Sequence, residues 1–338
     1  MTRDTRLKPM GDAMNHSRRK FLQLTSGLAL LPALPNVARA ETYPARQVRI
    51  IVGFAAGGGT DITARLIGQR LNERLGQPFI VENRPGAGAN IGMDAVAKAP
   101  PDGYTLLLVS PGAAINASLY EKLNYNFIRD IAPIAAIHRT PNVLAVHPSF
   151  PANTYAEFVA YAKANPGKVN VATSGIGASD HMSGELFRMM VGVDIVQVHY
   201  RGAAPAITDL VAGQVQASFA PMAPALEHLK ADKLRPLAVT TLARSDALPG
   251  IPAINEFVPG FESSTWYGLA APMGTPAAII DTLNKEINAA LADPAMSKRF
   301  ADLGGVPIPG SAADFGKLIA DETEKWAKVV KFAHVKLE

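Results

Sequence analysis

The sequence predicts an α/β protein of two lobes, each a mainly parallel sheet flanked by helices, with one ligand bound between them. The first observation is an apolar, β-branched run at 48–52 that ends in a glycine-rich loop, followed by apolar residues at helical spacing up to Leu75. The second is the same arrangement further along, where 169–173 leads through a glycine- and serine-rich loop into another helical pattern. The third is the alternation of strand-like and helix-like segments, which is typical of parallel sheets.

Residues 1–40 contain the three parts of an export signal. A twin-arginine motif at 17–22 precedes an apolar stretch at 22–34, and Ala38-Arg39-Ala40 is a small-residue cleavage site. The apolar stretch is shorter than the roughly 20 residues that a membrane-spanning helix needs. We therefore expect export to the periplasm, by the twin-arginine or the general secretory route, with cleavage after Ala40. The alternatives are an N-terminal anchor and a buried helix.

The basic character of the whole chain comes from this leader. The chain has 33 Lys and Arg against 29 Asp and Glu, and the first forty residues hold seven of the basic and two of the acidic ones. The remaining chain therefore has 26 basic and 27 acidic residues. A nucleic-acid-binding protein should keep a basic surface in its mature part, so this class is excluded. The absence of cysteine excludes disulfides and thiolate metal sites.

The chain after the leader is long enough for two domains. We expect lobe one to comprise 41–142 together with 263–338, and lobe two to comprise 143–262. The expected strands of lobe one are 48–52, 78–82, 105–110 and the return strand 265–272, and its expected helices are 61–75, 90–99, 276–291 and 312–332.

Lobe two is expected to begin with a crossing strand at 143–146 and to end with a proline- and glycine-rich connection at 247–261. Because the chain crosses between the lobes twice, we expect them to close about a hinge. The further strands expected here are 169–173, 195–200, 215–219 and 234–240, and the helices are 155–164, 179–191 and 206–212.

The two glycine-rich loops predict an anion site. Glycine lets backbone N–H groups approach a ligand, and the N-terminus of the following helix adds unpaired donors and the positive end of the helix dipole. Such a site most often binds phosphate or carboxylate. Ligands of parallel sheets also contact residues at the carboxyl ends of strands. The candidate ligand-binding residues are Phe54, Ala55, Gly57, Gly58, Gly59, Thr60, Asp61, Asn83, Ser110, Ser174, Gly177, Ala178, Ser179, His181, Tyr200, Arg201 and Trp266.

Four of these candidates have a structural alternative at a helix or turn. Asp61 is expected to act as a helix N-cap rather than as a ligand contact, and Ser179 is a second cap candidate whose hydroxyl would still face a carboxylate. For Asn83 and Ser110, turn or capping roles compete with ligand contact.

Three further candidates also have a structural alternative. His181 either makes structural hydrogen bonds or contacts the ligand, and no metal partner stands at coordinating spacing. We expect Phe54 to form a wall of the ligand site rather than part of a core. Trp266, with Tyr267, either shapes the cleft or packs against the C-terminal helices.

Four motifs occur in a characteristic order: 54–61 (FAAGGGTD), 83–88 (NRPGAG), 175–181 (GIGASDH) and 200–206 (YRGAAPA). Together they resemble the Bug (TctC-like) family of extracytoplasmic solute receptors, from about Tyr43 to the C-terminus. The resemblance implies a type II periplasmic binding protein, or Venus flytrap, that serves the membrane subunits of a tripartite tricarboxylate transporter or acts as a sensor partner. It also implies a small carboxylate ligand, held by backbone amides and ordered waters from both loops.

Two positions depart from the family pattern. Asp180 stands where small or prolyl residues usually precede the histidine, and we expect it to support the helix N-terminus. Gln216 stands where an acidic residue is common, which makes an amino-acid ligand less favourable.

Motifs of other chemistries are missing. No lysine follows the triple glycine as in a P-loop, and the sequence contains neither G-x-S-x-G nor H-E-x-x-H. We therefore expect no catalytic residue, cofactor or metal. Together with the anion site, the resemblance implies a monomeric receptor that captures a small organic carboxylate and delivers it to a membrane transporter. The alternatives are a periplasmic enzyme on the same scaffold and a ligand sensor for a signalling partner.

Overall fold

The computed structural model describes Thr2 and residues 43–335, and the fold lies in the compact unit that begins at Tyr43. The predicted leader, with its twin-arginine motif and its cleavage site after Ala40, falls outside the described residues apart from Thr2. None of the helices in the described part combines the length and the apolar character that a membrane crossing requires.

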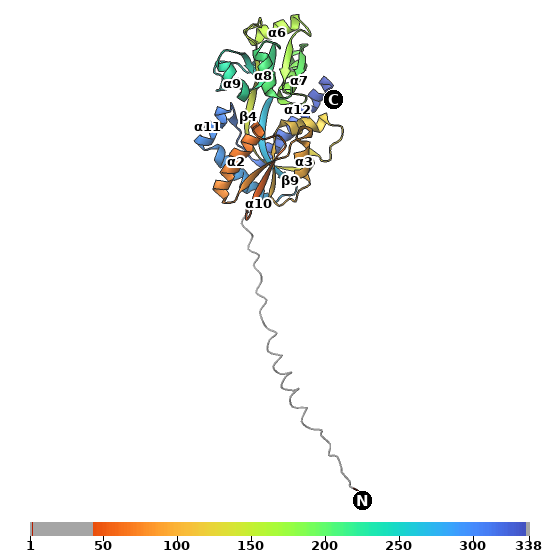
Figure 1. Ribbon diagram of the computed structural model, residues 1–338, viewed down its shortest axis with the longest axis vertical. Helices are drawn as coiled ribbons and strands as arrows, with labels where there is room; N and C mark the ends of the chain where they lie inside the picture. Colours follow the sequence, from red (N-terminus) through yellow and green to blue (C-terminus); the bar gives the residue numbers. More distant parts are fainter. Residues whose placement is uncertain (1, 3–42, 336–338) are drawn as a thin grey trace. The chain divides into compact units, whose positions relative to one another are not determined.

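The strands form a mixed sheet that passes through two lobes in the order β2-β1-β3-β9-β4-β7-β5-β6 (Figure 1). The long strand β4 (Ile131–Val146) connects the lobes, because its first part pairs with β9 (Ser264–Pro272) and its last part pairs with β7 and β8. The α/β, two-lobed architecture predicted from the sequence is therefore correct, whereas the residue boundaries of the lobes stay a prediction.

The neighbours of β1 and β5 are parallel, and those of β4 are antiparallel. The other strands are β1 (Val48–Val52), β2 (Phe79–Asn83), β3 (Thr105–Val109), β5 (Asn170–Thr173), β6 (Val196–His199), β7 (Ala217–Pro221), β8 (Arg235–Val239) and β10 (Val306–Pro307). The helices are α2 (Gly59–Leu75), α3 (Asn90–Ala97), α4 (Pro111–Leu119), α5 (Phe127–Asp130), α6 (Tyr155–Ala164), α7 (Ser179–Val191), α8 (Ala203–Val211), α9 (Met222–Lys230), α10 (Ala277–Leu291), α11 (Pro294–Asp302) and α12 (Ala312–Ala333), with short 3-10 turns η1 (Ala87–Ala89) and η2 (Ile254–Glu256).

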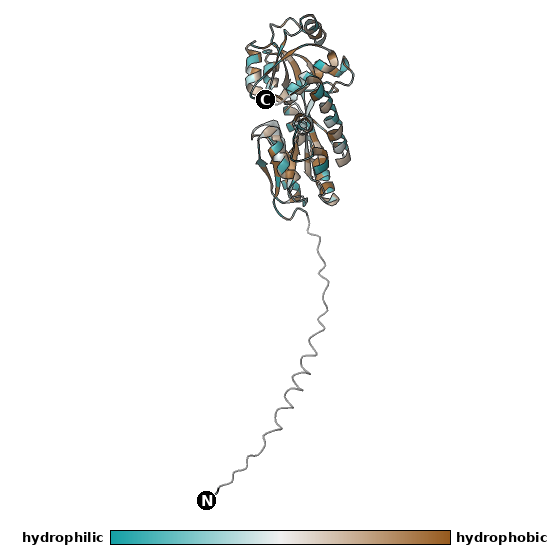
Figure 2. Ribbon diagram, turned by 90° about the vertical axis from the view of Figure 1, so that its right-hand side faces the viewer, coloured by the Kyte–Doolittle hydropathy of each residue, from teal (hydrophilic) through white to brown (hydrophobic). Residues whose placement is uncertain are grey.

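Helices cover both faces of the sheet in lobe one. Ile50 of β1 packs in a core with α2, α10 and α11, whereas Ile51 points to the opposite face and joins a core with α3, α4 and α12. The strand is apolar on both faces because both faces are buried, as expected for a central parallel strand. Figure 2 shows the apolar residues in brown along these central strands.

Lobe two is also a layered α/β structure. Helices α8 and α9 pack on one face of its strands, and α6 and α7 pack on the other. The C-terminal helix α12 packs against α4 and β4 of lobe one and also against α7 of lobe two. The expectation that 312–332 packs on lobe one is therefore incomplete, because this helix contacts both lobes.

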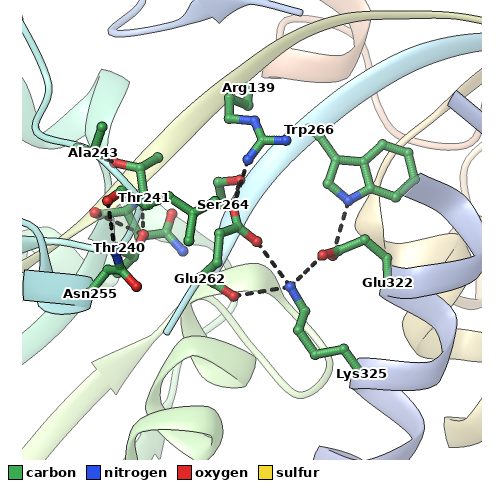
Figure 3. Close-up of polar contacts among 12 residues, drawn as sticks. Arg139, Thr240, Thr241, Ala243, Asn255, Glu262, Ser264, Trp266, Glu322 and Lys325 are labelled. Carbon is green, nitrogen blue, oxygen red and sulfur yellow. Dashed lines mark hydrogen bonds and ion pairs between the residues drawn. The ribbon is translucent and has the colours of Figure 1, made fainter. Parts of the chain in front are cut away.

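A partly buried polar network lies at the start of β9, where the chain returns from lobe two to lobe one (Figure 3). The ammonium of Lys325 on α12 donates to the carbonyl and the carboxylate of Glu262, at 3.0 Å each, and is paired with Glu322. Arg139 on β4 pairs with the same Glu262 at 3.1 Å, and the indole of Trp266 donates to Glu322 at 3.1 Å. The network thus joins β4, β9 and α12 at the hinge.

Most of the predicted elements lie within a few residues of their predicted positions, and the elements that were missed fall mainly at 111–142, 222–230 and 294–307. The sequence predicts a crossing strand at 143–146 only, but β4 begins at Ile131. Two prolines, Pro133 and Pro141, interrupt the apolar pattern, and the ladder with β9 accommodates the long strand through register shifts after Pro133 and after Ala136. Helices α4, α5, α9 and α11 and the short strand β10 were also not predicted.

Candidate functional site

A cavity of about 290 Å³ lies between the lobes, and we call it the polar cavity. Lobe one contributes the loop after β1, η1, the start of β9 and helix α4, and lobe two contributes the loop after β5. Its lining residues are Phe54, Thr60, Gly88, Ser110, Pro111, Gly112, Asn116, Leu119, Tyr120, Ser174, Gly175, Ile176, Gly177, Ala178, Ser179 and Thr265.

Three helices begin at this cavity without a side-chain cap. Helix α2 begins after Gly58, α4 after Ser110 and α7 after Ala178, and none of these N-cap residues makes a side-chain hydrogen bond to its helix. The first N–H groups of a helix have no intrahelical partner, and the N-terminus carries the positive end of the helix dipole. The arrangement therefore presents backbone donors and partial positive charge from both lobes.

Hydroxyl groups add to these donors. Thr60, Ser110 and Ser179 line the polar cavity, and their hydroxyls have no hydrogen-bond partner among the described residues. Thr60 is the second residue of α2, Ser110 the N-cap of α4 and Ser179 the first residue of α7. The sequence thus places a hydroxyl beside each uncapped helix N-terminus.

Asp61 holds the first glycine-rich loop in shape. Its carboxylate accepts hydrogen bonds from the Gly57 amide at 2.9 Å and from the Asn83 side chain at 3.0 Å, and it pairs with Arg65 at 2.9 Å. The guanidinium of Arg65, together with these donors, lowers the pKa of Asp61 to about 2. The prediction that Asp61 is the N-cap is wrong, because Gly58 occupies that position and Asp61 reaches back from the third residue of the helix.

Asp180 and His181 hold the second glycine-rich loop in the same way. The Asp180 carboxylate accepts the amide and the hydroxyl of Ser174, at 2.6 Å each, and burial raises the pKa of this carboxyl. The Nδ1 atom of His181 accepts the Gly177 amide at 3.1 Å. Burial lowers the pKa of His181 to about 4, so this imidazole is neutral at pH 7. Both side chains hydrogen-bond to the loop and do not line the polar cavity themselves.

The polar cavity is electrically neutral apart from the helix ends. Its lining, as far as the chain is described, contains no Asp, Glu, Lys, Arg or His. Within residues 43–335, no group of three or more His, Asp or Glu is placed to hold a metal ion. The lining can donate hydrogen bonds to an anion from its hydroxyl groups and from the amides at the helix N-termini.

A second cavity, of about 360 Å³, lies next to the first, and we call it the apolar cavity. Gly57, Gly58 and Gly59 line it, whereas the next residue, Thr60, lines the polar cavity. Thr265 at the start of β9 lines both. The first glycine-rich loop therefore lies between two neighbouring spaces.

The predicted site residues fall into three groups. Phe54, Thr60, Ser110, Ser174, Gly177, Ala178 and Ser179 line the polar cavity, and Gly57, Gly58 and Gly59 line the apolar cavity. The remaining candidates line neither cavity: Ala55, Asp61, Asn83, His181, Tyr200, Arg201 and Trp266.

Several residues of this third group have structural partners. Tyr200 donates to Asp209 at 2.8 Å, and Trp266 is buried against α12 with its indole on Glu322. The Asn83 amide donates to the Phe54 carbonyl at 3.0 Å, so it braces the first loop. Gln216 accepts the Asn170 amide at 2.9 Å and lines neither cavity, so it gives no information about an amino-acid ligand.

Sequence reasoning missed the contribution of α4. Asn116 and Tyr120 line the polar cavity, and the Asn116 side chain also donates to the Gly88 carbonyl at 2.6 Å. A signal was available, because Ser110-Pro111 after a buried strand is a typical N-cap followed by proline at the first helical position. Thr265 had no comparable signal, since its place depends on the pairing of β9 with β4.

The fold and the site together define a two-lobed solute-binding protein of the periplasmic binding protein class. The sequence matches the family described as "Tripartite tricarboxylate transporter family receptor" over residues 63–335. The chain belongs to this family of receptors, as its resemblance to the Bug (TctC-like) proteins predicted.

Proteins of known sequence or structure are similar to this chain over most of their length. Protein BugT of Bordetella pertussis is 39% identical over 302 residues, which is 88% of this chain and 93% of BugT. The structure "R. palustris Rpa4515 with adipate" is similar with a TM-score of 0.77 and 38% identity, covering 87% of this chain and 99% of that one. MatC from Rhodopseudomonas palustris, with bound malate, has a TM-score of 0.73 and 32% identity, over 85% of this chain and 100% of its own.

Proposed function

We propose that this chain is a periplasmic solute-binding receptor that captures a small organic carboxylate in the polar cavity and delivers it to the membrane subunits of a tripartite tricarboxylate transporter. The observation that carries this proposal is the convergence of three uncapped helix N-termini, from both lobes, on one neutral cavity. A carboxylate would accept from the free amides and from the hydroxyls beside them, without a buried arginine or lysine.

The relatives support the chemical class of the ligand. Adipate and malate, named in the titles of two similar structures, are both small carboxylates. Because both lobes line the cavity, ligand binding would favour the closed arrangement of the hinge and give a transporter a surface that the open form lacks. We further propose that the leader directs export and is removed after Ala40, and that the receptor acts as a monomer.

No feature of the polar cavity favours the alternative function, an enzyme on the same scaffold. A hydroxyl nucleophile needs an adjacent base, and the described lining has Ser and Thr hydroxyls but no Asp, Glu, His or Lys beside them to take the proton.

The test is thermal unfolding of residues 41–338 against citrate, C4 to C6 dicarboxylates, acidic amino acids and benzoate-like acids. A ligand at 100 times its Kd should stabilise the fold by about 2.7 kcal/mol. A saturable shift for one group of acids, with the acid recovered unchanged, is the expected result. If the folded, ligand-free protein shows no shift with any carboxylate, the proposal is wrong.

A designed variant locates the effect in the polar cavity. A Cβ atom added at Gly112 would meet the Phe54 ring at 3.7 Å, an ordinary contact, so Gly112→Leu should fold and obstruct the cavity. The matched control is Ala278→Leu, at the second residue of α10 and away from both cavities. We expect the ligand-induced shift to disappear in the first variant and to persist in the second.

A further inference from the structure

Helix α4 presents one face to the polar cavity. Gly112, Asn116 and Tyr120 are spaced four residues apart, which places them on the same side of the helix, and all three line the cavity. Asn116 is the sixth residue of α4, so it lies about 7 Å along the helix from Pro111. Asn116 and Tyr120 therefore line a part of the cavity beyond the free amides at the start of α4.

The hydrogen bonds of Asn116 fix the orientation of its side-chain amide. The Gly88 carbonyl can only accept, so the Asn116 atom that lies 2.6 Å from it is the Nδ2 nitrogen. The same nitrogen donates to Oδ1 of Asn90 at 3.0 Å, and the Tyr125 hydroxyl donates to that oxygen at 2.7 Å. Both N–H groups of Asn116 are therefore used, and the atom that it has left for a ligand is the acceptor Oδ1.

Two oxygen atoms on this face of α4 lack a partner in the described chain. Neither Oδ1 of Asn116 nor the hydroxyl of Tyr120 has a hydrogen-bond partner among residues 43–335. A Cβ atom added at Gly88 would lie 3.5 Å from the first oxygen and 3.1 Å from the second, so both oxygens border the same lining residue. Asn116 is only 4% exposed, and buried oxygens are normally paired. The two oxygens are therefore available to a ligand in the polar cavity.

An acceptor in this part of the cavity selects the group of the ligand that faces it. A carboxylate has only acceptor oxygens, so it cannot pair with Oδ1 of Asn116. An ammonium group could donate to Oδ1, but the described lining contains no Asp or Glu to balance its charge once it is desolvated. A hydroxyl group fits, because it can donate to Asn116 and accept from Tyr120 at the same time.

We propose that the ligand of the polar cavity carries a hydroxyl group that donates to Oδ1 of Asn116 and accepts from the hydroxyl of Tyr120, so that these two residues select hydroxy acids over their parent acids. The inference rests on the proposed function and adds the residues that recognise the second polar group of the ligand. The carboxylate then lies at the uncapped helix N-termini, and the hydroxyl group orients the rest of the molecule along α4.

The first test compares acids that differ in this group alone. Calorimetry on residues 41–338 gives the Kd of butanoate and its 2-, 3- and 4-hydroxy derivatives, and of succinate and malate. We expect the preferred hydroxy acid to bind about fivefold more tightly than its parent, which is the effect of one neutral hydrogen bond. The matching oxo acid keeps an oxygen at the same carbon but cannot donate, so it should lose this advantage.

The second test removes the acceptor. Asn116→Leu keeps the branched shape of the side chain and should bring the hydroxy acid and its parent to the same Kd. This variant also loses the hydrogen bonds to Gly88 and Asn90, so the measured quantity is the ratio of the two Kd values. If Asn116 only braced the loop, both acids would weaken equally and the ratio would stay as in the wild type.

A third variant leaves these bracing contacts in place. Tyr120→Phe removes a hydroxyl that has no partner among the described residues, so it should fold as the wild type does, reduce the preference for the hydroxy acid and leave the Kd of the parent unchanged. The matched control is Tyr161→Phe on α6, at a tyrosine that lines neither cavity, and it should keep the preference.

The outcomes separate this inference from the proposed function. If the parent acids bind as tightly as the hydroxy acids, if the oxo acid matches the hydroxy acid, or if aspartate binds more tightly than malate, the hydroxyl assignment is overturned while the receptor function stands. A preference that survives both Asn116→Leu and Tyr120→Phe overturns the role of these residues. If no acid of either series binds to the folded protein, the inference and the proposed function are both overturned.

Discussion

At the scale of single residues, Asp61 and Asp180 hydrogen-bond to the glycine-rich loops and do not line the cavities beside them. Each carboxylate accepts a backbone amide of its loop. Glycine loops lose much conformational entropy on folding, so a buried acceptor that fixes their amides compensates part of that loss. The carboxylates thus preorganise the site from outside it.

Asp61 gives a prediction on pH. Its folded pKa of about 2 lies below the unfolded value near 3.9, so its stabilisation is complete above about pH 5 and is lost as the pH falls from 4 toward 2. Asp61→Asn should lower the free energy of unfolding by about 1–2 kcal/mol at pH 7, because the ion pair with Arg65 is lost. Urea unfolding at pH 7 and pH 3 should show that the difference from wild type narrows in acid.

The control for this prediction is Asp302→Asn. Asp302 is exposed and pairs with Lys298 on the surface of α11, so its replacement should cost less than about 1 kcal/mol. Equal losses for the two variants, or a loss at Asp61 that does not change with pH, would contradict the role given to Asp61.

At the scale of elements, the hinge depends on β4, β9 and α12, which the network around Glu262 ties together (Figure 3). Glu322 is 4% exposed and relies on Lys325 and on the Trp266 and Trp326 indoles as partners. A buried carboxylate that loses its cation is costly, whereas an exposed ion pair contributes little.

Lys325→Met should therefore destabilise the protein by about 2–3 kcal/mol, less than most fully buried pairs because Lys325 is partly exposed. Lys328→Met, one turn along on the solvent side of α12, removes an exposed pair with Glu324 and should cost less than about 1 kcal/mol. Urea unfolding of both variants measures the difference. Similar midpoints for the two would show that the network does not stabilise the hinge.

The sequence predicted an element well where its local signals, such as apolar spacing and capping residues, agree. It predicted an element poorly where the pairing of distant strands determines the structure. Helix α2 ends at Gly76, whose φ of 72° is the left-handed conformation that favours glycine, and the prediction placed its end there. The first half of β4 was missed because Pro133 and Pro141 argue against a strand, and only the ladder with β9 overrides them. Of the site, both glycine-rich loops were predicted, whereas Asn116 and Thr265 depend on tertiary contacts.

At the scale of the whole molecule, strands β4 and β9 both connect the lobes and contribute residues to the cavities between them. β4 and β9 run from lobe one to the hinge, and residues on them line the apolar cavity, while one apolar core on the α12 side extends through both lobes. Both lobes line the polar cavity, so a ligand bound there would couple binding to closure of the lobes. The proposed delivery to a transporter requires such a coupling, because the loaded receptor must differ in shape from the empty one.

The most direct measurement of the central claim is the structure of the chain bound to the acid that stabilises it most. We predict a carboxylate in the polar cavity, within hydrogen-bond distance of backbone N–H groups at the start of α2 and α7, with the Thr60 or Ser179 hydroxyl as a further donor. No arginine or lysine should contact it. A carboxylate bound through a basic side chain, or outside the space between the lobes, would contradict this account of the site.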